Sequence, residues 1–161
     1  MSIEKYLILS KYILSLFGVE EFRDLQQKFK DDGVDTGSDG LGDFVSKLRA
    51  IENLKIKEDD LTRYDDNIQD YEKEISRKRG KISLKYFQYL AVLFTEIILD
   101  NLKNRKDEFL RELNKFLEGY KQEQSIEINS FTEKDLRKLA IWMATGSGKT
   151  LIMHINYHQF F

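Results

Sequence analysis

Hydrophobic residues recur every three or four positions along most of this 161-residue chain, as they do on one face of an amphipathic helix. Each such run predicts a helix, and the runs cover residues 3–17, 20–30, 41–54, 61–75, 85–102 and 109–117. In the second run we expect Phe22, Leu25 and Phe29 to point inward. The run over 85–102 is apolar on most of its faces, so we expect it to be the most buried helix.

Glycines mark the expected ends of three of these helices. Gly18, Gly80 and Gly119 each follow a helical run. Glycine is favoured just beyond a helix C-terminus, because it reaches backbone conformations that other residues resist. The sequence has no proline, which favours long uninterrupted helices.

Three segments depart from the helical pattern. Residues 31–42 are rich in glycine and aspartate and predict a flexible surface loop. Their Asp spacing hints at a calcium loop, but Ser46 stands where the bidentate glutamate should be. Residues 125–129 alternate apolar and polar side chains, which suits a short strand, and the apolar run Leu139–Met143 suits a buried strand.

The composition limits the chemistry that the chain can perform. It has no cysteine, which excludes disulfides, thiolate metal sites and cysteine nucleophiles. Its formal net charge is −2, so overall charge alone does not make it a binder of polyanions. The N-terminus lacks the pattern of a signal peptide, and the longest apolar stretch, residues 89–99, is too short to cross a bilayer. We therefore expect a cytoplasmic protein without a membrane partner.

Residues 143–150 carry a motif with a specific chemistry, and they read Met-Ala-Thr-Gly-Ser-Gly-Lys-Thr. Gly146 and Gly148 let the backbone approach a phosphate closely, so that successive N–H groups point into one concavity. An expected strand precedes this turn and an expected helix, residues 151–161, follows it, so helix N-terminal N–H groups also face the anion. The general P-loop pattern begins with glycine, where this chain has Met143.

The motif predicts a nucleotide site with ATP and Mg²⁺ as its cofactors. Lys149 supplies a positive charge for the β- and γ-phosphates, and the Thr150 hydroxyl is expected to be a ligand of Mg²⁺. The predicted nucleotide-binding residues are those of the loop itself, Thr145, Gly146, Ser147, Gly148, Lys149 and Thr150. The alternative is a chance glycine turn in front of a helix.

At the segments Lys85-Tyr-Phe-Gln-Tyr-Leu90 and Leu139-Ala-Ile-Trp-Met-Ala-Thr-Gly-Ser-Gly-Lys-Thr150, the sequence resembles the superfamily 2 helicases and translocases. It looks most like the motor subunits of type III restriction enzymes and the related DEAD/DEAH-type helicases of bacterial defence systems. In that family the first position of the loop need not be glycine. The resemblance covers residues 83–161 and implies an ATP-dependent motor whose full-length form acts on DNA.

The resemblance also implies a role for Gln88. In such motors a glutamine upstream of the P-loop reads adenine, because an amide offers one donor and one acceptor side by side. Gln88, within Tyr86-Phe-Gln-Tyr89, resembles that element. The alternative is a polar residue on the exposed strip of a buried helix.

We therefore predict a mainly α protein. A helical N-terminal region, residues 1–80 with the flexible loop at 31–42, precedes the truncated beginning of a RecA-like α/β P-loop domain at residues 81–161. That beginning consists of a strand, the P-loop and a helix. In the resembling family the Walker B acid and later motifs lie downstream. We therefore expect an N-terminal fragment with no complete catalytic set, which does not hydrolyse ATP alone.

Three further features allow other interpretations. The Leu61–Ile75 seam suits packing within the chain or, alternatively, a helical protein-interaction module beside a vestigial P-loop. The basic run 77–81 suits a helix C-terminus capped by Gly80, or contact with nucleic-acid phosphates. His154 and His158 lie one helical turn apart, a spacing that suits a metal site but is also ordinary in a helix.

Overall fold

The structure is a computed structural model, and it describes residues 6–30, 43–141 and 146–160. Within these ranges the protein is mainly helical and contains no β-strand. Its elements are α1 (Ile8–Leu16), α2 (Phe22–Lys30), α3 (Asp43–Arg49), α4 (Glu58–Arg79), α5 (Tyr86–Asn104), α6 (Lys106–Gln124), the short 3-10 helix η2 (Asp135–Arg137) and α7 (Lys149–Phe160).

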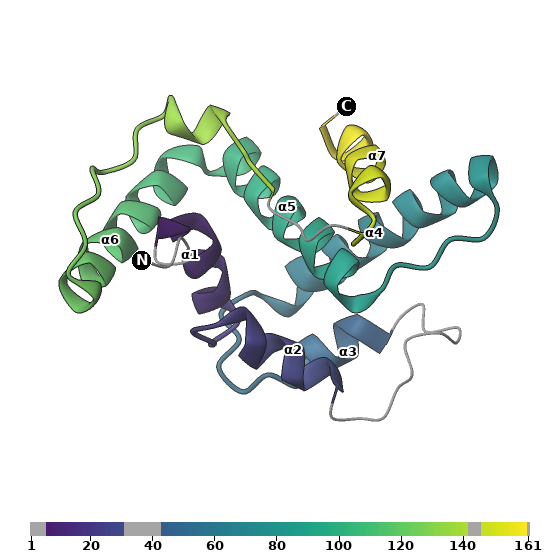
Figure 1. Cartoon of the computed structure of the whole chain (residues 1–161), viewed down its shortest axis with the longest axis horizontal. Coiled ribbons are helices and arrows are strands. Elements are labelled where there is room, and N and C mark those ends of the chain that lie inside the picture. Colours follow the sequence, from purple (N-terminus) through teal and green to yellow (C-terminus); the bar gives the residue numbers. More distant parts are fainter. Residues whose placement is uncertain (1–5, 31–42, 142–145, 161) are drawn as a thin grey trace.

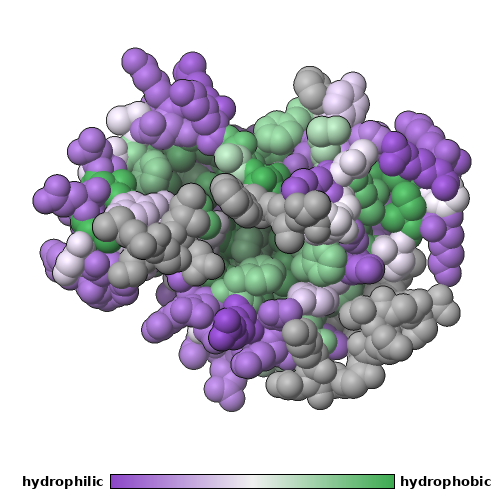
Figure 2. All heavy atoms as spheres, in the orientation of Figure 1, coloured by the Kyte–Doolittle hydropathy of each residue, from purple (hydrophilic) through white to green (hydrophobic). Residues whose placement is uncertain are grey.

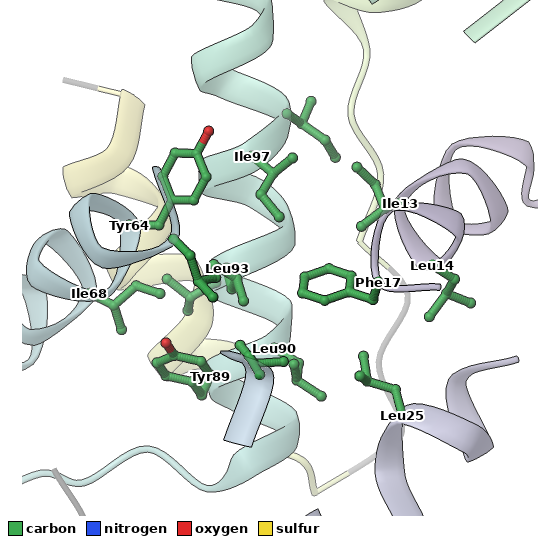
Figure 3. Close-up of a cluster of buried hydrophobic side chains, with 14 of the residues drawn as sticks. Ile13, Leu14, Phe17, Leu25, Tyr64, Ile68, Tyr89, Leu90, Leu93 and Ile97 are labelled. Carbon is green, nitrogen blue, oxygen red and sulfur yellow. The ribbon is translucent and has the colours of Figure 1, made fainter. Parts of the chain in front are cut away.

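Helix α5 lies at the centre of the molecule, where it packs against α4, α6 and α7 (Figure 1). Ten of its residues are buried, more than in any other described helix, so the expectation for the run 85–102 is confirmed. Figure 3 shows α5 side chains between those of the helices around it. The labelled residues are Tyr89, Leu90, Leu93 and Ile97 of α5, Ile13 and Leu14 of α1, Phe17 just after α1, Leu25 of α2, and Tyr64 and Ile68 of α4.

Helix α4 is favoured by charges at both of its ends. Acidic residues 58–60 occupy its first turn and basic residues 77–79 its last, so each group faces the helix-dipole end of opposite sign. Gly80 follows with a φ of 85°, and its N–H bonds to the Ser76 carbonyl at 3.0 Å. The helix-capping interpretation of Gly80 is therefore confirmed.

The apolar seam of α4 packs inside the chain. Leu61, Tyr64, Ile68 and Ile75 are each less than 5% exposed, and α4 contacts α3, α5 and α7. Full burial of apolar side chains of this size contributes about 1.5–3 kcal/mol each. Because the seam is already covered, the structure does not favour the alternative of a partner-binding module on this face.

Helices α1 and α6 form the other side of the core. The Tyr12 ring lies edge-on to Phe109 and to Phe116, each at 5.7 Å between centroids, and its hydroxyl donates to Glu112 Oε2 at 2.8 Å. Burial and this carboxylate raise the pKa of Tyr12. Gly18, with a φ of 66°, lies just after the end of α1, as the sequence predicts.

Two sequence predictions about side chains and helix ends are wrong. Phe22 was expected to point inward, but it is 41% exposed, whereas Leu25 and Phe29 are buried as expected. Gly119 was expected to end a helix, but α6 continues through it to Gln124 and ends at Ser125, which has a φ of 50°. A glycine can adopt helical angles, and the buried residues Leu113 and Leu117 hold this helix on the core.

The strand predicted over residues 125–129 is not present in the structure. The chain there has no sheet partner, and the stretch that follows is held by one side chain of α6. Asn114 Oδ1 accepts the N–H of Phe131 at 2.7 Å, and Asn114 Nδ2 donates to the Phe131 carbonyl at 3.0 Å. An amide side chain of α6 therefore holds the chain just beyond the predicted strand.

The second predicted strand, Leu139–Met143, is not supported by its described part. Residues 139–141 have no strand assignment and Ile141 is 40% exposed, while residues 142–143 lie outside the described ranges. The beginning of a RecA-like sheet is therefore not confirmed. The loop at 31–42, with its calcium-loop alternative, also lies outside the described ranges.

The molecular surface is mostly polar around an apolar centre. Figure 2 shows hydrophobic residues gathered in the middle of one face, with hydrophilic side chains around the rim. On the outer side of α7, Met153, Tyr157 and Phe160 are each more than half exposed. Across the residues that the structure describes, no helix has the length and apolar character needed to cross a membrane.

Candidate functional site

The glycine turn ahead of α7 has the backbone shape that its sequence requires. Gly146 and Gly148 have φ angles of 78° and 84°, in the left-handed region that residues with a Cβ rarely adopt. The Gly148 carbonyl accepts bonds from the N–H groups of Leu151 at 2.9 Å and Ile152 at 3.2 Å, so α7 begins directly after the turn. Thr145, also predicted to bind nucleotide, lies outside the described residues.

Lys149 and Thr150 occupy the first turn of α7 and are both exposed. The first four N–H groups of a helix lack partners within it, and the helix dipole makes this end positive. An exposed ammonium, a hydroxyl and a helix N-terminus therefore occur together at the glycine turn. This combination suits an anion with several oxygens, such as a phosphate chain.

Gln88 joins the start of α5 to the glycine turn. Its Nε2 donates to the Ser147 carbonyl at 2.9 Å, although the two residues are 59 positions apart in sequence. Its Oε1 accepts the N–H of Lys85 at 3.0 Å, so the Gln88 side chain caps the N-terminus of α5. Gln88 is 8% exposed, so the interpretation that places it on an exposed strip is wrong.

The absence of a Cβ at Gly148 leaves room for this contact. A Cβ built on Gly148 would overlap Gln88 Nε2, whereas one built on Gly146 would meet no described residue within 4 Å. The two glycines therefore differ in what surrounds them. Gly146 is required by its backbone angle alone, and Gly148 by its angle and by the Gln88 amide beside it.

The segment before α5 is held by two polar side chains of α4, the buried Glu72 and the half-buried Ser76. Glu72 Oε1 accepts the Leu84 N–H at 2.6 Å, and Ser76 Oγ accepts the Ile82 N–H at 3.0 Å. Burial raises the pKa of Glu72, the bond from Leu84 opposes this shift, and the nearby Asp65 carboxylate adds to it. These bonds fix the path by which the chain reaches Lys85 and Gln88.

Helix α7 is seated on α4 and α5 by both apolar and polar contacts. Ile152 and Ile155 are at most 2% exposed. Gln159 Nε2 donates to Glu96 Oε1 at 2.8 Å and to the Val92 carbonyl at 3.1 Å. Sequence reasoning missed Glu96, whose available signal was a charged residue in the middle of an otherwise apolar helical run.

The other residues that the sequence suggested for phosphate or metal binding make ordinary side-chain contacts of helix residues. Arg77 and Lys78 each form an ion pair with Glu74 at 3.1 Å. His154 Nε2 lies 3.4 Å from an Arg79 guanidinium nitrogen. Among the residues with a described position, no group of three His, Cys, Asp or Glu side chains is arranged to hold a metal ion, so nothing supports the metal interpretation of His154 and His158.

Comparison with known proteins identifies a relationship for the C-terminal segment. Residues 95–161 match the family model described as "Type III restriction enzyme, res subunit". The match spans less than half of the chain, contains the glycine turn and α7, and begins after Gln88. It confirms the resemblance of this segment to the res subunit. No curated protein and no solved structure shows significant similarity to the chain.

Proposed function

We propose, from the similarity of residues 95–161 to the res subunit of type III restriction enzymes, that this chain is the ATP-binding part of a DNA helicase-like or translocase-like protein of restriction or defence type. The observation that carries the proposal is the glycine turn at the N-terminus of α7. Its two left-handed glycines lie directly before Lys149 and Thr150.

The turn supplies the groups that a Mg²⁺-bound triphosphate needs. The N–H groups at residues 146–150 would hold phosphate oxygens, and Lys149 would neutralise charge on the β- and γ-phosphates. Thr150 would contribute its hydroxyl to the Mg²⁺ ion that bridges them. Hydrolysis also requires an acidic residue for the metal and a residue that positions the attacking water. We assign neither role to any residue of this chain, so the proposed activity is binding.

Gln88 completes the proposed nucleotide site in one of two ways. Its amide uses one donor for Ser147 and one acceptor for Lys85, and a carboxamide has a second donor and further acceptor capacity. The remaining groups would suit an adenine edge, as the resemblance implies. If Gln88 reads no base, its bond to Ser147 still holds the phosphate loop against α5.

The test is a titration with fluorescent ATP and GTP analogues in the presence of Mg²⁺. Lys149→Ala should weaken binding of the ATP analogue by at least about tenfold, because one phosphate contact to a full charge is lost. Lys115→Ala removes the same charge from an exposed position on α6 and should bind as the wild type does. Equal binding by wild type and Lys149→Ala would refute the proposal.

The same titration separates the two roles of Gln88. If Gln88 reads adenine, Gln88→Leu should reduce the preference for ATP over GTP. If Gln88 only holds the loop, Gln88→Leu should weaken the binding of the ATP and GTP analogues by the same factor. DNA is the partner that we propose for the protein, and the similarity of residues 95–161 to the res subunit supports this.

A further inference from the structure

Glu96 is a buried carboxylate that the proposed phosphate site does not use. It lies in the middle of α5 and is 7% exposed. Its Oε2 accepts a bond from Asn67 Nδ2 of α4 at 3.1 Å, and its Oε1 accepts one from Gln159 Nε2 of α7 at 2.8 Å. Burial and the nearby Glu96 carboxylate raise the pKa of Tyr71 of α4. Glu96 thus connects three helices.

A buried carboxylate holds its partners firmly. It is tolerated only where hydrogen-bond donors replace the water it has lost, and its bonds are shorter and stronger than those between neutral groups. Gln159 gives its amide group to two acceptors of α5, the Glu96 carboxylate and the Val92 carbonyl. The last turn of α7 is therefore fixed at one place along α5.

The two ends of the P-loop helix are both held by α5. At the start, Gln88 donates to the Ser147 carbonyl, and at the end, Glu96 accepts from Gln159. The 12 positions from 147 to 159 would span roughly 18 Å along a helix axis. Two contacts this far apart determine both the position of the helix along its axis and its rotation about that axis.

Hydrophobic burial alone would leave this rotation weakly determined. α7 has Ile152 and Ile155 on its inner side, but Met153 and Tyr157 are 64% and 63% exposed on its outer side. A helix with apolar residues on both sides has no single preferred face toward the core. Polar contacts must therefore select the face that α7 turns inward.

We propose that Glu96 is a positioning residue for the nucleotide site. By holding Gln159, it sets the rotation and axial position of α7, and so the direction in which Lys149, Thr150 and the first N–H groups of the helix face the phosphates. The expected effect of Glu96 on nucleotide binding rests on the proposed function. The restraint of α7 by Glu96 does not, because it is measurable without nucleotide.

Gln159 offers a variant that tests the same contact from the α7 side. Its Oε1 is buried and has no hydrogen-bond partner in the described part of the chain. Gln159→Met has a similar shape and lacks that oxygen, but it cannot bond to Glu96 and leaves the Glu96 carboxylate without this donor. It should therefore lower the overall stability as well as free the end of α7, and the comparison with a second buried carboxylate separates the two effects.

The test compares Glu96→Gln and Gln159→Met with the matched control Asp65→Asn. Asp65 is a second buried carboxylate between α4 and α5, at 5% exposure, and it accepts bonds from Tyr89 of α5 at 2.6 Å and Gln69 of α4 at 2.7 Å. Amide hydrogen exchange of residues 146–160 is measured on the nucleotide-free chain. Affinity for a fluorescent ATP analogue with Mg²⁺ is measured on the same samples.

Glu96→Gln and Gln159→Met should each speed exchange in α7 and weaken analogue binding by about three- to tenfold, the effect of one hydrogen bond to a charged group. Asp65→Asn should change neither quantity in the folded protein. If Glu96→Gln exchanges in α7 as the wild type does, or if Asp65→Asn accelerates it equally, the proposal is overturned. Equal binding by wild type and Lys149→Ala would instead overturn the nucleotide function, while the exchange comparison would still decide whether Glu96 restrains α7.

Discussion

At the scale of single residues, Gly148 links the shape of the glycine turn to the position of Gln88. The left-handed backbone at Gly148 turns the chain toward α7, and its missing Cβ leaves space for the amide that bonds to Ser147. Gly146 has almost the same φ without a neighbour at its Cβ position. Alanine substitutions at the two glycines can therefore be compared. The one at Gly146 would add backbone strain alone, and the one at Gly148 would add backbone strain and remove the Gln88 contact.

We predict that Gly148→Ala lowers the free energy of unfolding more than Gly146→Ala does. Each alanine would be forced into a left-handed conformation, which costs roughly 1–2 kcal/mol. Only the alanine at 148 would also displace Gln88 from Ser147, at a further cost of about 1 kcal/mol. Urea unfolding of both variants would measure this difference. Equal losses would contradict the contact between Gln88 and the loop.

The glycine turn before α7 is predictable from sequence because its signal is local. Two glycines, a lysine and a threonine at fixed spacing, with an apolar run on each side, specify a turn and a helix start within a few residues. The bonds of Gln88 to Ser147 and of Glu96 to Gln159 join positions 59 and 63 residues apart. Periodicity gives no information about such pairs, since they depend on how α7 packs against α5.

At the scale of elements, helix α6 carries a glycine in its interior. A Cβ built on Gly119 would meet nothing within 4 Å, and the residue is exposed. The helix continues past this position because tertiary packing of Leu113 and Leu117 outweighs the low helix propensity of one residue. The glycine is therefore a local weakness with no packing role in the described structure.

We predict that Gly119→Ala raises the free energy of unfolding by about 0.5–1 kcal/mol, because alanine loses less backbone entropy in a helix. Gly80→Ala is the matched control, since its Cβ would also meet nothing within 4 Å. Its φ of 85° is unfavourable for alanine, so this variant should be destabilised by a similar amount. Thermal or urea unfolding of both variants would show whether each is more or less stable than the wild type. A loss of stability in Gly119→Ala would contradict the prediction.

The segment between α4 and α5 depends on the ionisation of Glu72. Its pKa is raised in the folded protein, so near that pKa the folded state binds more protons than the unfolded state. Stability from this group therefore increases as the pH falls through the raised pKa toward the ordinary value of 4.5, and decreases as the pH rises. A depressed pKa, such as that of Glu74 beside Lys78 and Arg77, acts in the opposite direction.

We predict that Glu72→Gln raises the free energy of unfolding at pH 7 by roughly 1 kcal/mol, because it removes a buried charge and keeps an oxygen for the Leu84 N–H. The gain should shrink as the pH approaches 4.5. Urea unfolding of wild type and variant at several pH values between 4.5 and 8 would measure it. A difference that is independent of pH would show that Glu72 has no raised pKa.

The helices were predicted correctly from the sequence, whereas the two predicted strands are not supported by the structure, and this difference has a physical reason. The three-to-four-residue period of α4 and α5 extends over many turns, so their existence follows from the sequence even though their ends differ by a few residues. Ile126 and Ile128 alternate with polar residues over only five positions. In the fold they are partly buried against the core beside α6, where no strand lies next to them to form a sheet.

At the scale of the whole molecule, α5 has the most buried residues of the described helices. It contacts α4, α6 and α7, and it carries Gln88 at its start and Glu96 in its middle (Figure 1). The predicted mainly α architecture is confirmed, while the expected RecA-like beginning is not. A short apolar run such as 139–141 fits a strand or an irregular segment equally well, and the sequence alone does not decide between them.

The segment that connects α6 to α7 is a suitable place for limited proteolysis followed by reassembly of the two pieces. Lys134, Arg137 and Lys138 lie exposed on it, beyond the point where Asn114 holds Phe131. Trypsin would be expected to cleave after these basic residues. The short C-terminal piece would stay attached through the contacts of its helix with α4 and α5, so a nicked protein would run as one species until denatured. A synthetic peptide would then be able to replace that piece, which would allow unnatural side chains to be placed at Lys149.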